Sequence, residues 1–301
     1  MIRLSRFKQV LVAAACSLAM FGTAQADDKV YRLKLAESWP TNFPVFGDAP
    51  RNMAAMAEKM SNGRLQITID SANKHKSAFG VFDMVRAGQY DMGHSASYYW
   101  KGKVPNTLYF TTMPFGMTAP EQYAWFYHGG GMELMEKVYG EFNILSFPGG
   151  NTGNQMGGWF QKEINSVEDL QGLKMRIPGL AGEVFDAAGG SAVRIAGGEV
   201  YTSMQTGVID AVEWVGPYND RTLGLMEVGN YYYYPGWHEP GAMLEIIVNE
   251  EALAALPDDL QAIVRVAARA TNSDMLDDFT AHNSESLEIL LRDFDTELLP
   301  L

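Results

Sequence analysis

The sequence has little cysteine, few positive charges and no long apolar run. Its single cysteine, Cys16, lies in an N-terminal segment expected to be removed, so the mature chain has no disulfide and no thiol chemistry. No later stretch reaches 18 uninterrupted apolar residues, which argues against a permanent membrane-spanning helix. Lys and Arg number 23 against 36 Asp and Glu. This acidic balance argues against nucleic acid and anionic membranes as partners.

The N-terminus has the three parts of a cleavable signal peptide. Three basic residues precede an apolar segment at positions 10–21, and Ala24-Gln25-Ala26 forms an A-x-A cleavage site. We therefore expect a signal peptide over residues 1–26, a mature chain from Asp27, and a soluble periplasmic protein. Losing three basic residues leaves 20 basic against 36 acidic residues, a formal charge of −16. About 275 mature residues are enough for one large or two medium domains.

Strand and helix patterns alternate along the chain, which predicts an α/β fold. Strands are expected at 31–36, 65–69, 92–94, 155–160, 174–177 and 192–195, and helices with apolar periodicity at 53–60, 79–87 and 181–188. A strongly periodic segment after Pro257 predicts one helix running to about Arg292. Such a helix is long enough to lie along two domains.

Residues 81–91 align with residues 200–210 at an offset of 119, with Val, Gly and Asp coinciding. Each copy reads as a helix, a glycine C-cap and a turn into a strand. Chance similarity between two common units is the alternative. A true repeat predicts two related lobes, with the matched strands ending near His94 and Glu213 beside a shared crevice.

The stretch LKMRIPG places Arg176 near the end of a short strand, just before a Pro-Gly stop. Ligands bind outside the carboxyl ends of strands in open α/β sheets. Other polar and aromatic groups follow the same rule in GNTGNQMGGWF (150–160), DAVEWVGP (210–217) and GWHEPG (236–241). Each residue also has an ordinary interpretation, as a solvated arginine, a turn asparagine, a strand-end acid or a core tryptophan. Together they indicate a binding cleft.

In these motifs the chain resembles the TRAP-transporter solute-binding proteins of the DctP type, and most closely the subgroup that binds 2-oxo and 2-hydroxy monocarboxylates with a metal ion. The resemblance covers essentially the whole mature chain and rests on SAFGVFDMVRAGQYDMGHSASYYW, GNTGNQMGGWF, DLQGLKMRIPG, VYTSMQTGVIDAVEW and GWHEPG, in that order. It implies a two-lobed periplasmic binding-protein fold with an interlobe cleft and a long helix bridging both lobes. The implied parts are lobe I at 27–149, lobe II at 150–238, and a return to lobe I with the bridging helix at 239–301.

The resemblance also implies the roles of individual residues. Arg176 matches the arginine that pairs with the solute carboxylate. The positions implied to touch the solute are Asn151, Gln155, Trp214 and one or both of Tyr98 and Tyr99, whose orientation the sequence leaves open. The positions implied to hold the metal are Gln155, Glu213, Glu239 and, through its backbone carbonyl, Trp214.

Charge supports a metal once these residues share a cleft. Glu213, Glu239 and a solute carboxylate carry three negative charges against the single positive charge of Arg176, and burying the excess is costly. All the donors are oxygens, so the expected ion is Ca²⁺ or Na⁺ rather than Zn²⁺.

The resemblance also implies the partners of the protein. The family implies a small carboxylate solute and TRAP membrane permease subunits as partners, without catalysis. Relatives usually continue with further helix beyond Leu301, and such helices can support a homodimer.

Two alternative functions also stay open: a periplasmic ligand sensor for a membrane receptor, and a binder of a sugar acid or dicarboxylate. A hydrolase would use His128-Gly129-Gly130-Gly131 with Gly93-His94-Ser95-Ala96-Ser97, but these motifs come in the wrong order for an esterase. A glycosidase would use the two glutamates.

Overall fold

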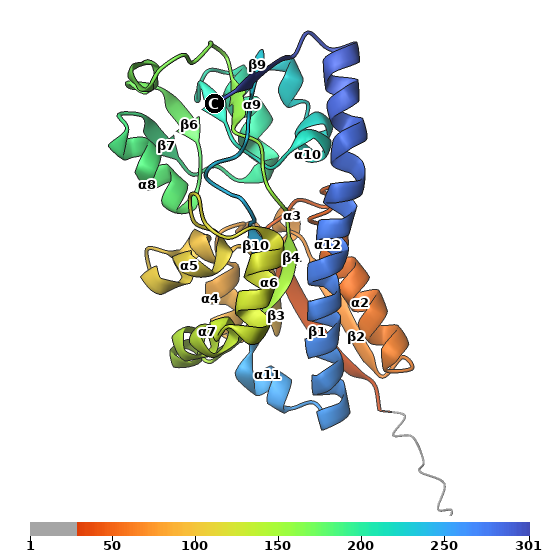
Figure 1. The fold of residues 1–301 in the computed structure, drawn as a ribbon. Helices are drawn as coiled ribbons and strands as arrows, with labels where there is room; N and C mark the ends of the chain where they lie inside the picture. Colours follow the sequence, from red (N-terminus) through yellow and green to blue (C-terminus); the bar gives the residue numbers. More distant parts are fainter. Residues whose placement is uncertain (1–28) are drawn as a thin grey trace, which may run out of the picture. The chain divides into compact units, whose positions relative to one another are not determined.

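The computed structural model describes residues 29–301. The expected signal peptide at 1–26 therefore lies outside the described residues. Two β-sheets organise the described chain (Figure 1). No helix within 29–301 combines the length and apolar character needed to cross a membrane.

The first sheet has the strand order β2-β1-β3-β10-β4. Strands β2, β1 and β3 are parallel, and β10 runs antiparallel to both β3 and β4. Its strands are β1 (Tyr31–Glu37), β2 (Leu65–Asp70), β3 (Met92–Ser95), β4 (Ile144–Asn151) and β10 (Met243–Asn249). The α-helices on this side are α2 (Asp48–Met60), α3 (Ala72–His75), α4 (Val81–Arg86), α5 (Leu108–Thr111), α6 (Ala119–His128), α7 (Gly131–Tyr139) and α11 (Glu250–Ala254). We call the elements built on this sheet the first lobe.

The second sheet has the order β11-β9-β5-β8-β6-β7. Its strands are β5 (Gly158–Phe160), β6 (Lys174–Arg176), β7 (Ser191–Val193), β8 (Ala211–Val212), β9 (Tyr231–Tyr234) and β11 (Glu297–Pro300). Its helices are α8 (Gly179–Ala187), α9 (Val200–Gln205) and α10 (Pro217–Thr222). We call these elements the second lobe. Short 3₁₀ segments lie at Ser97–Trp100 (η1), Pro105–Thr107 (η2), Gly140–Phe142 (η3), Val167–Leu170 (η4), Gly197–Glu199 (η5) and Leu225–Glu227 (η6).

The long helix α12 (Asp258–Asp293) confirms the helix predicted after Pro257, and it packs against both lobes (Figure 1). In its first half, Leu260 and Val264 join the apolar core beneath the first sheet. Further along, Phe279 reaches the aromatic cluster between the lobes, and Asn283 Oδ1 accepts a hydrogen bond of 3.1 Å from the backbone N–H of Tyr218 in α10. The helix is stable at this length because packing on two cores supplements its local propensity.

The internal repeat is present in the structure. Helices α4 and α9 both end at a glycine with positive φ, +68° at Gly88 and +71° at Gly207, where an L-residue would be strained. The strands that follow occupy equivalent places, because β2-β1-β3 and β7-β6-β8 are both parallel runs with the same connections. The two segments therefore occupy equivalent places in their sheets, as a true repeat predicts.

The aspartate that ends each copy makes the same contact. Asp91 Oδ2 accepts the backbone N–H of Lys34 at 2.7 Å, and Asp210 Oδ2 accepts that of Lys174 at 2.9 Å. Each aspartate N–H also donates to the carbonyl of the same lysine, at 3.0 and 2.7 Å. These paired bonds fix the start of β3 against β1 and of β8 against β6, so both lobes present their strand ends in the same way.

Two segments differ from the structure predicted from the sequence. Residues 155–157 are not part of β5, because their N–H groups bond outside a strand pairing, to the carbonyls of Glu239, Val215 and Tyr233. The terminal strand β11 pairs in parallel with β9 of the second sheet, whereas residues 239–301 were expected to consist of a return to the first lobe and the bridging helix. Its pairing covers an edge of that sheet that would otherwise expose unpaired backbone groups.

Candidate functional site

Arg176 lies at the carboxyl end of β6 with only 2% of its surface exposed. Its Nη1 donates to the backbone carbonyl of Glu213 at 2.5 Å and to Glu213 Oε2 at 3.1 Å. Its Nε donates to the carbonyl of Ile195 at 3.4 Å. A buried guanidinium is stable only when it is paired and hydrogen-bonded. The strand therefore ends in a fixed positive charge, and the interpretation of Arg176 as a solvated surface arginine is wrong.

Arg176 lines a small cavity. The ten residues that line it come from both lobes and are mostly apolar or aromatic: Trp39, Phe46, Tyr98, Tyr99, Thr152, Gln155, Arg176, Trp214, Ala242 and Leu244. Both tyrosines belong to η1 rather than to a strand, so no alternation of faces separates them and both line the cavity.

Trp214 supports the arginine from one side. The guanidinium carbon of Arg176 lies 4.6 Å from the centroid of the Trp214 ring, a cation–π arrangement. The indole N–H donates to Asn219 Oδ1 at 3.1 Å, and Asn219 Nδ2 donates to the carbonyl of Pro44 in the first lobe, also at 3.1 Å. Phe43 packs edge-on against the indole at 5.4 Å. The indole is thus held by contacts with both lobes.

Gln155 and Glu239 present buried oxygens without partners. The N–H of Gln155 donates to the carbonyl of Glu239 at 3.0 Å, which joins the 152–157 loop to the GWHEPG loop. Among the described residues, Gln155 Oε1 and both carboxyl oxygens of Glu239 lack a hydrogen-bond partner. Burial, and then the charge of Glu213, raises the pKa of Glu239 well above its usual range. Buried oxygens without hydrogen-bond partners attract positive charge, so this part of the site is suited to a cation.

Glu213 lies between the Gln155 and Glu239 oxygens and Arg176 in this network, since it pairs with Arg176 and its charge acts on Glu239. Its Oε1 lies 3.7 Å from Nε2 of His238, a fully buried imidazole neither of whose nitrogens has a hydrogen-bond partner in the described chain. No cluster of three or more His, Cys, Asp or Glu side chains in residues 29–301 has metal-binding geometry. A metal here would therefore need amide or carbonyl oxygens beside the two carboxylates.

Asn151 is fully buried at the end of β4 but does not line the cavity. Its Nδ2 donates to Gln122 Oε1 at 2.8 Å and its Oδ1 accepts the N–H of Gly153 at 2.9 Å. Its side chain thus shapes the turn that leads to Gln155.

Sequence reasoning missed Trp39, Phe46, Thr152, Ala242 and Leu244 as lining residues. For Trp39 a signal was available. The tripeptide Ser38-Trp39-Pro40 follows directly after β1, the strand equivalent to β6 in the repeat. The strand-end rule that selected Arg176 would have selected Trp39 as well.

The two esterase-like motifs do not assemble in the described chain. The Ser95 hydroxyl pairs with Ser38 at 2.6 Å, and the imidazole of His94 bonds Trp39 and the carbonyl of Gly149. His128 is exposed at the end of α6, whereas Ser95 is buried. These contacts leave neither motif with a nucleophile–base pair.

Polar contacts cross between the lobes beside the cavity. Lys101 Nζ donates to the carbonyl of Gly179 at 2.9 Å and pairs with Glu183 at 2.7 Å. Arg194 Nη1 donates to the carbonyl of Tyr99 at 2.6 Å. These bonds join η1 and the residue after it in the first lobe to α8 and to the residue after β7 in the second.

Comparison with known proteins agrees with this architecture. The family model DctP, described as bacterial extracellular solute-binding protein, family 7, matches residues 35–299. A monocarboxylate 2-oxoacid-binding periplasmic protein of Nostoc sp. is 44% identical over 286 residues, which cover 95% of this chain and 78% of that protein.

Two crystal structures of TRAP periplasmic solute-binding proteins are also similar. The protein from Pseudoalteromonas atlantica, with bound sodium and pyruvate, is 57% identical with a TM-score of 0.88, over 91% of this chain and 83% of that one. The protein from Colwellia psychrerythraea, with bound calcium and pyruvate, is 59% identical with a TM-score of 0.88, over 90% of this chain and 83% of that one. The resemblance seen in the sequence and the two-lobed fold are confirmed. The chain belongs to the DctP family of bacterial extracellular solute-binding proteins.

Proposed function

We propose that this chain is the periplasmic solute-binding subunit of a TRAP-type secondary transporter, and that it binds a small 2-oxo or 2-hydroxy monocarboxylate together with Ca²⁺ or Na⁺. The observation that carries the proposal is the fully buried Arg176 in a small aromatic cavity beside oxygens that lack partners. Relatives at 57% and 59% identity hold pyruvate with sodium or calcium, which supports the same solute class here.

In this proposal Arg176 pairs with the solute carboxylate. A guanidinium fork matches a carboxylate in shape and charge, and burial strengthens the attraction. Tyr98 and Tyr99 line the cavity, and their hydroxyls would bond the solute oxygens. Trp214 keeps the guanidinium in place from behind. Asn151 acts through the turn it stabilises.

The metal would be held by Gln155, Glu213, Glu239 and the backbone carbonyl of Trp214. The fit rests on the unpartnered buried oxygens of Gln155 and Glu239, which are costly to bury without a positive partner. An all-oxygen donor set suits a hard cation, and two carboxylates favour a divalent ion. When bound, the ion supplies positive charge that offsets the carboxylates and attracts the solute.

The pyruvate held by the two relatives favours a short acid over a sugar acid or a dicarboxylate. A periplasmic sensor with the same site is the second candidate, and adjacent genes for two permease subunits would separate it from a transporter. Cleavage after Ala26, delivery to a membrane permease and a homodimer belong to the same proposal.

The test is a thermal-shift screen of small acids on the mature chain, with and without Ca²⁺, followed by calorimetry. Pyruvate or another short 2-oxo acid should raise the melting temperature in the presence of metal, because a ligand that binds only the native state stabilises it. A response to hexuronates or dicarboxylates alone would overturn the proposed solute class.

A further inference from the structure

Trp39 lines the same small cavity as Arg176 and Trp214. Its ring is 2% exposed and packs against Phe46 at 4.5 Å and Tyr99 at 6.3 Å between ring centroids. A solute substituent that points away from Arg176 has to fit within this aromatic wall. The position of the Trp39 ring therefore limits which acids the cavity accepts.

Trp39 is fixed by one side-chain hydrogen bond. Its indole Nε1–H donates to His94 Nδ1 at 2.9 Å. Because an indole N–H can only donate, Nδ1 must accept, and the ring proton is on Nε2. That proton is donated to the carbonyl of Gly149 in β4 at 3.2 Å. The imidazole is thus bonded on both sides, to the wall residue and to the strand that leads to Asn151.

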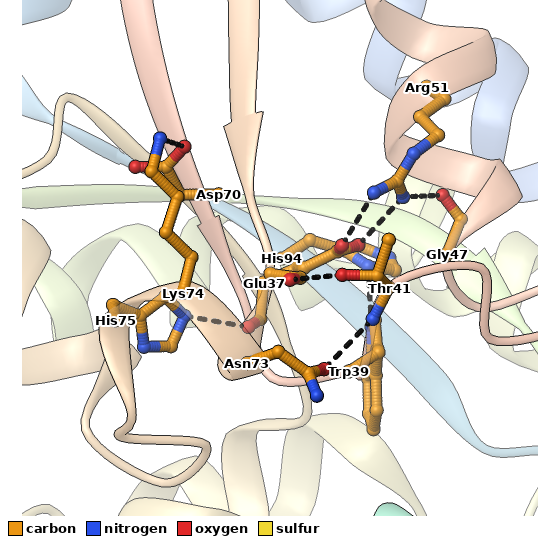
Figure 2. A network of polar contacts seen from close by, with 11 residues as sticks. Glu37, Trp39, Thr41, Gly47, Arg51, Asp70, Asn73, Lys74, His75 and His94 are labelled. Carbon is orange, nitrogen blue, oxygen red and sulfur yellow. Dashed lines mark hydrogen bonds and ion pairs between the residues drawn. The ribbon is translucent and has the colours of Figure 1, made fainter.

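The charged groups next to His94 are engaged elsewhere, as Figure 2 shows. Glu37 is in register with His94 on the adjacent strand, but its carboxylate is bonded by Arg51 at 2.9 and 3.2 Å. Burial lowers the pKa of His94 to about 4, so the imidazole is neutral at ordinary pH. A neutral ring in this tautomer keeps Nδ1 free to accept from Trp39.

We propose that His94 is a positioning residue for the solute site: by accepting the Trp39 N–H it holds the indole wall in place and so limits the size of the substituent on a bound 2-oxo acid. The proposal rests on the proposed function and adds a determinant of specificity that does not touch the solute. The two hydrogen bonds of His94 within the described chain go to Trp39 and to the Gly149 carbonyl, and neither partner is among the proposed metal donors.

The chemistry of the imidazole offers a matched pair of variants. In His94→Asn the amide oxygen lies near the position of Nδ1 and can accept from Trp39. In His94→Gln the amide nitrogen lies near the position of Nε2 and can donate to Gly149, while the acceptor for Trp39 is lost. Trp39→Phe keeps an aromatic wall and removes the N–H donor. His282→Gln, on the exposed face of α12, is the control.

The experiment measures, by calorimetry in saturating Ca²⁺, the ratio of affinities for pyruvate and for its larger analogue 3-methyl-2-oxobutanoate. His94→Gln and Trp39→Phe should each lower this preference about tenfold, the usual value of a small change in an apolar pocket. His94→Asn should keep most of the parent's preference for pyruvate, and His282→Gln should leave that preference unchanged. Combining His94→Gln with Trp39→Phe should add little, because both remove the same bond. Equal preference in the His94→Gln variant and the parent, or fully additive effects, would overturn the proposal.

The indole N–H resonance of Trp39, assigned by its loss in Trp39→Phe, gives a readout without solute. It should shift in His94→Gln and stay close to the parent position in His94→Asn. An unmoved resonance in His94→Gln removes His94 as the partner of Trp39. A parent protein that binds no 2-oxo acid would instead remove the proposed function, so the two failures are distinguishable.

Discussion

Arg176 and Glu213 form an ion pair in which both side chains are at least 98% buried, with 3.1 Å between Nη1 and Oε2. The same Nη1 donates to the Glu213 backbone carbonyl at 2.5 Å. The guanidinium is therefore oriented before a solute arrives, and binding does not have to order it. Its orientation depends on a planar group that donates to the backbone carbonyls of Glu213 and Ile195 and to the Glu213 carboxylate.

Replacing Arg176 by lysine should therefore weaken solute binding although the charge is kept. A lysine ammonium loses the planar fork and the stacking on Trp214. The expected loss is about 1.5–3 kcal/mol, the value of a hydrogen bond to a charged group. Calorimetry with pyruvate and Ca²⁺ measures it, with Arg292→Lys on exposed α12 as the control. Equal affinity in Arg176→Lys and the parent would exclude Arg176 as the carboxylate partner.

Metal and acid should bind cooperatively. Glu239 is buried close to Glu213, and a cation lowers the cost of bringing a third carboxylate beside them. Linkage requires that each ligand tighten the other by the same factor. Glu239→Gln should reduce that factor, because a neutral amide attracts the cation less than the carboxylate that Glu239 presents once metal displaces its proton, while exposed Glu285→Gln should not. Titrating pyruvate into chelator-stripped and Ca²⁺-loaded protein measures the coupling. Identical affinities in the two states would remove the metal from the mechanism.

The bonds of Lys101 across the lobes should slow solute release. Lys101→Met removes the contacts to Gly179 and Glu183, and we expect dissociation to become about 3–10 times faster, since a half-exposed ion pair contributes little beyond the carbonyl bond. Lys103→Met is the matched control, because its partner Asp83 lies in the same lobe. Stopped-flow displacement of bound pyruvate measures the rate. Similar rates for the two variants would show that Lys101 does not hold the lobes closed.

Much of this fold could be predicted from the sequence. Helix α12 and the repeat were predictable because each rests on local patterns, apolar periodicity in one case and a helix–Gly–Asp unit in the other. Arg176 was predictable because it combines a charge with a strand end. The terminal strand β11 was not, since a four-residue segment carries no periodicity, and its pairing with β9 depends on where α12 ends.

The site was only partly predictable, for a similar reason. Phe46, Ala242 and Leu244 are ordinary core residues in sequence, and only their place beside Arg176 makes them cavity residues. Asn151 has the residue type and position of a ligand contact, but its amide is used by Gln122 and Gly153. Which side chains share a cavity depends on the closure of two lobes, and no local pattern encodes that contact.

Stability should fall as the pH rises through neutrality, with Glu245 as one cause. Its carboxyl is fully buried and accepts the Tyr139 hydroxyl at 2.5 Å. Burial raises the pKa of Glu245 from 4.5 to about 7. Between these values the folded chain binds a proton that the unfolded chain releases. The stabilisation is therefore complete below pH 4.5 and is lost as the pH rises through 7, by up to about 3 kcal/mol.

Glu37 and Asp220, whose pKa values burial also raises to about 7, add to the same slope, so a difference measurement is needed. In Glu245→Gln the amide oxygen can still accept from Tyr139, but no proton is exchanged. The free energy of unfolding of this variant, relative to the parent, should therefore increase between pH 5 and pH 8. Urea unfolding at both pH values measures it, and exposed Glu288→Gln should follow the parent. Parallel pH profiles for Glu245→Gln and the parent would mean that this carboxyl does not change protonation on unfolding in that range.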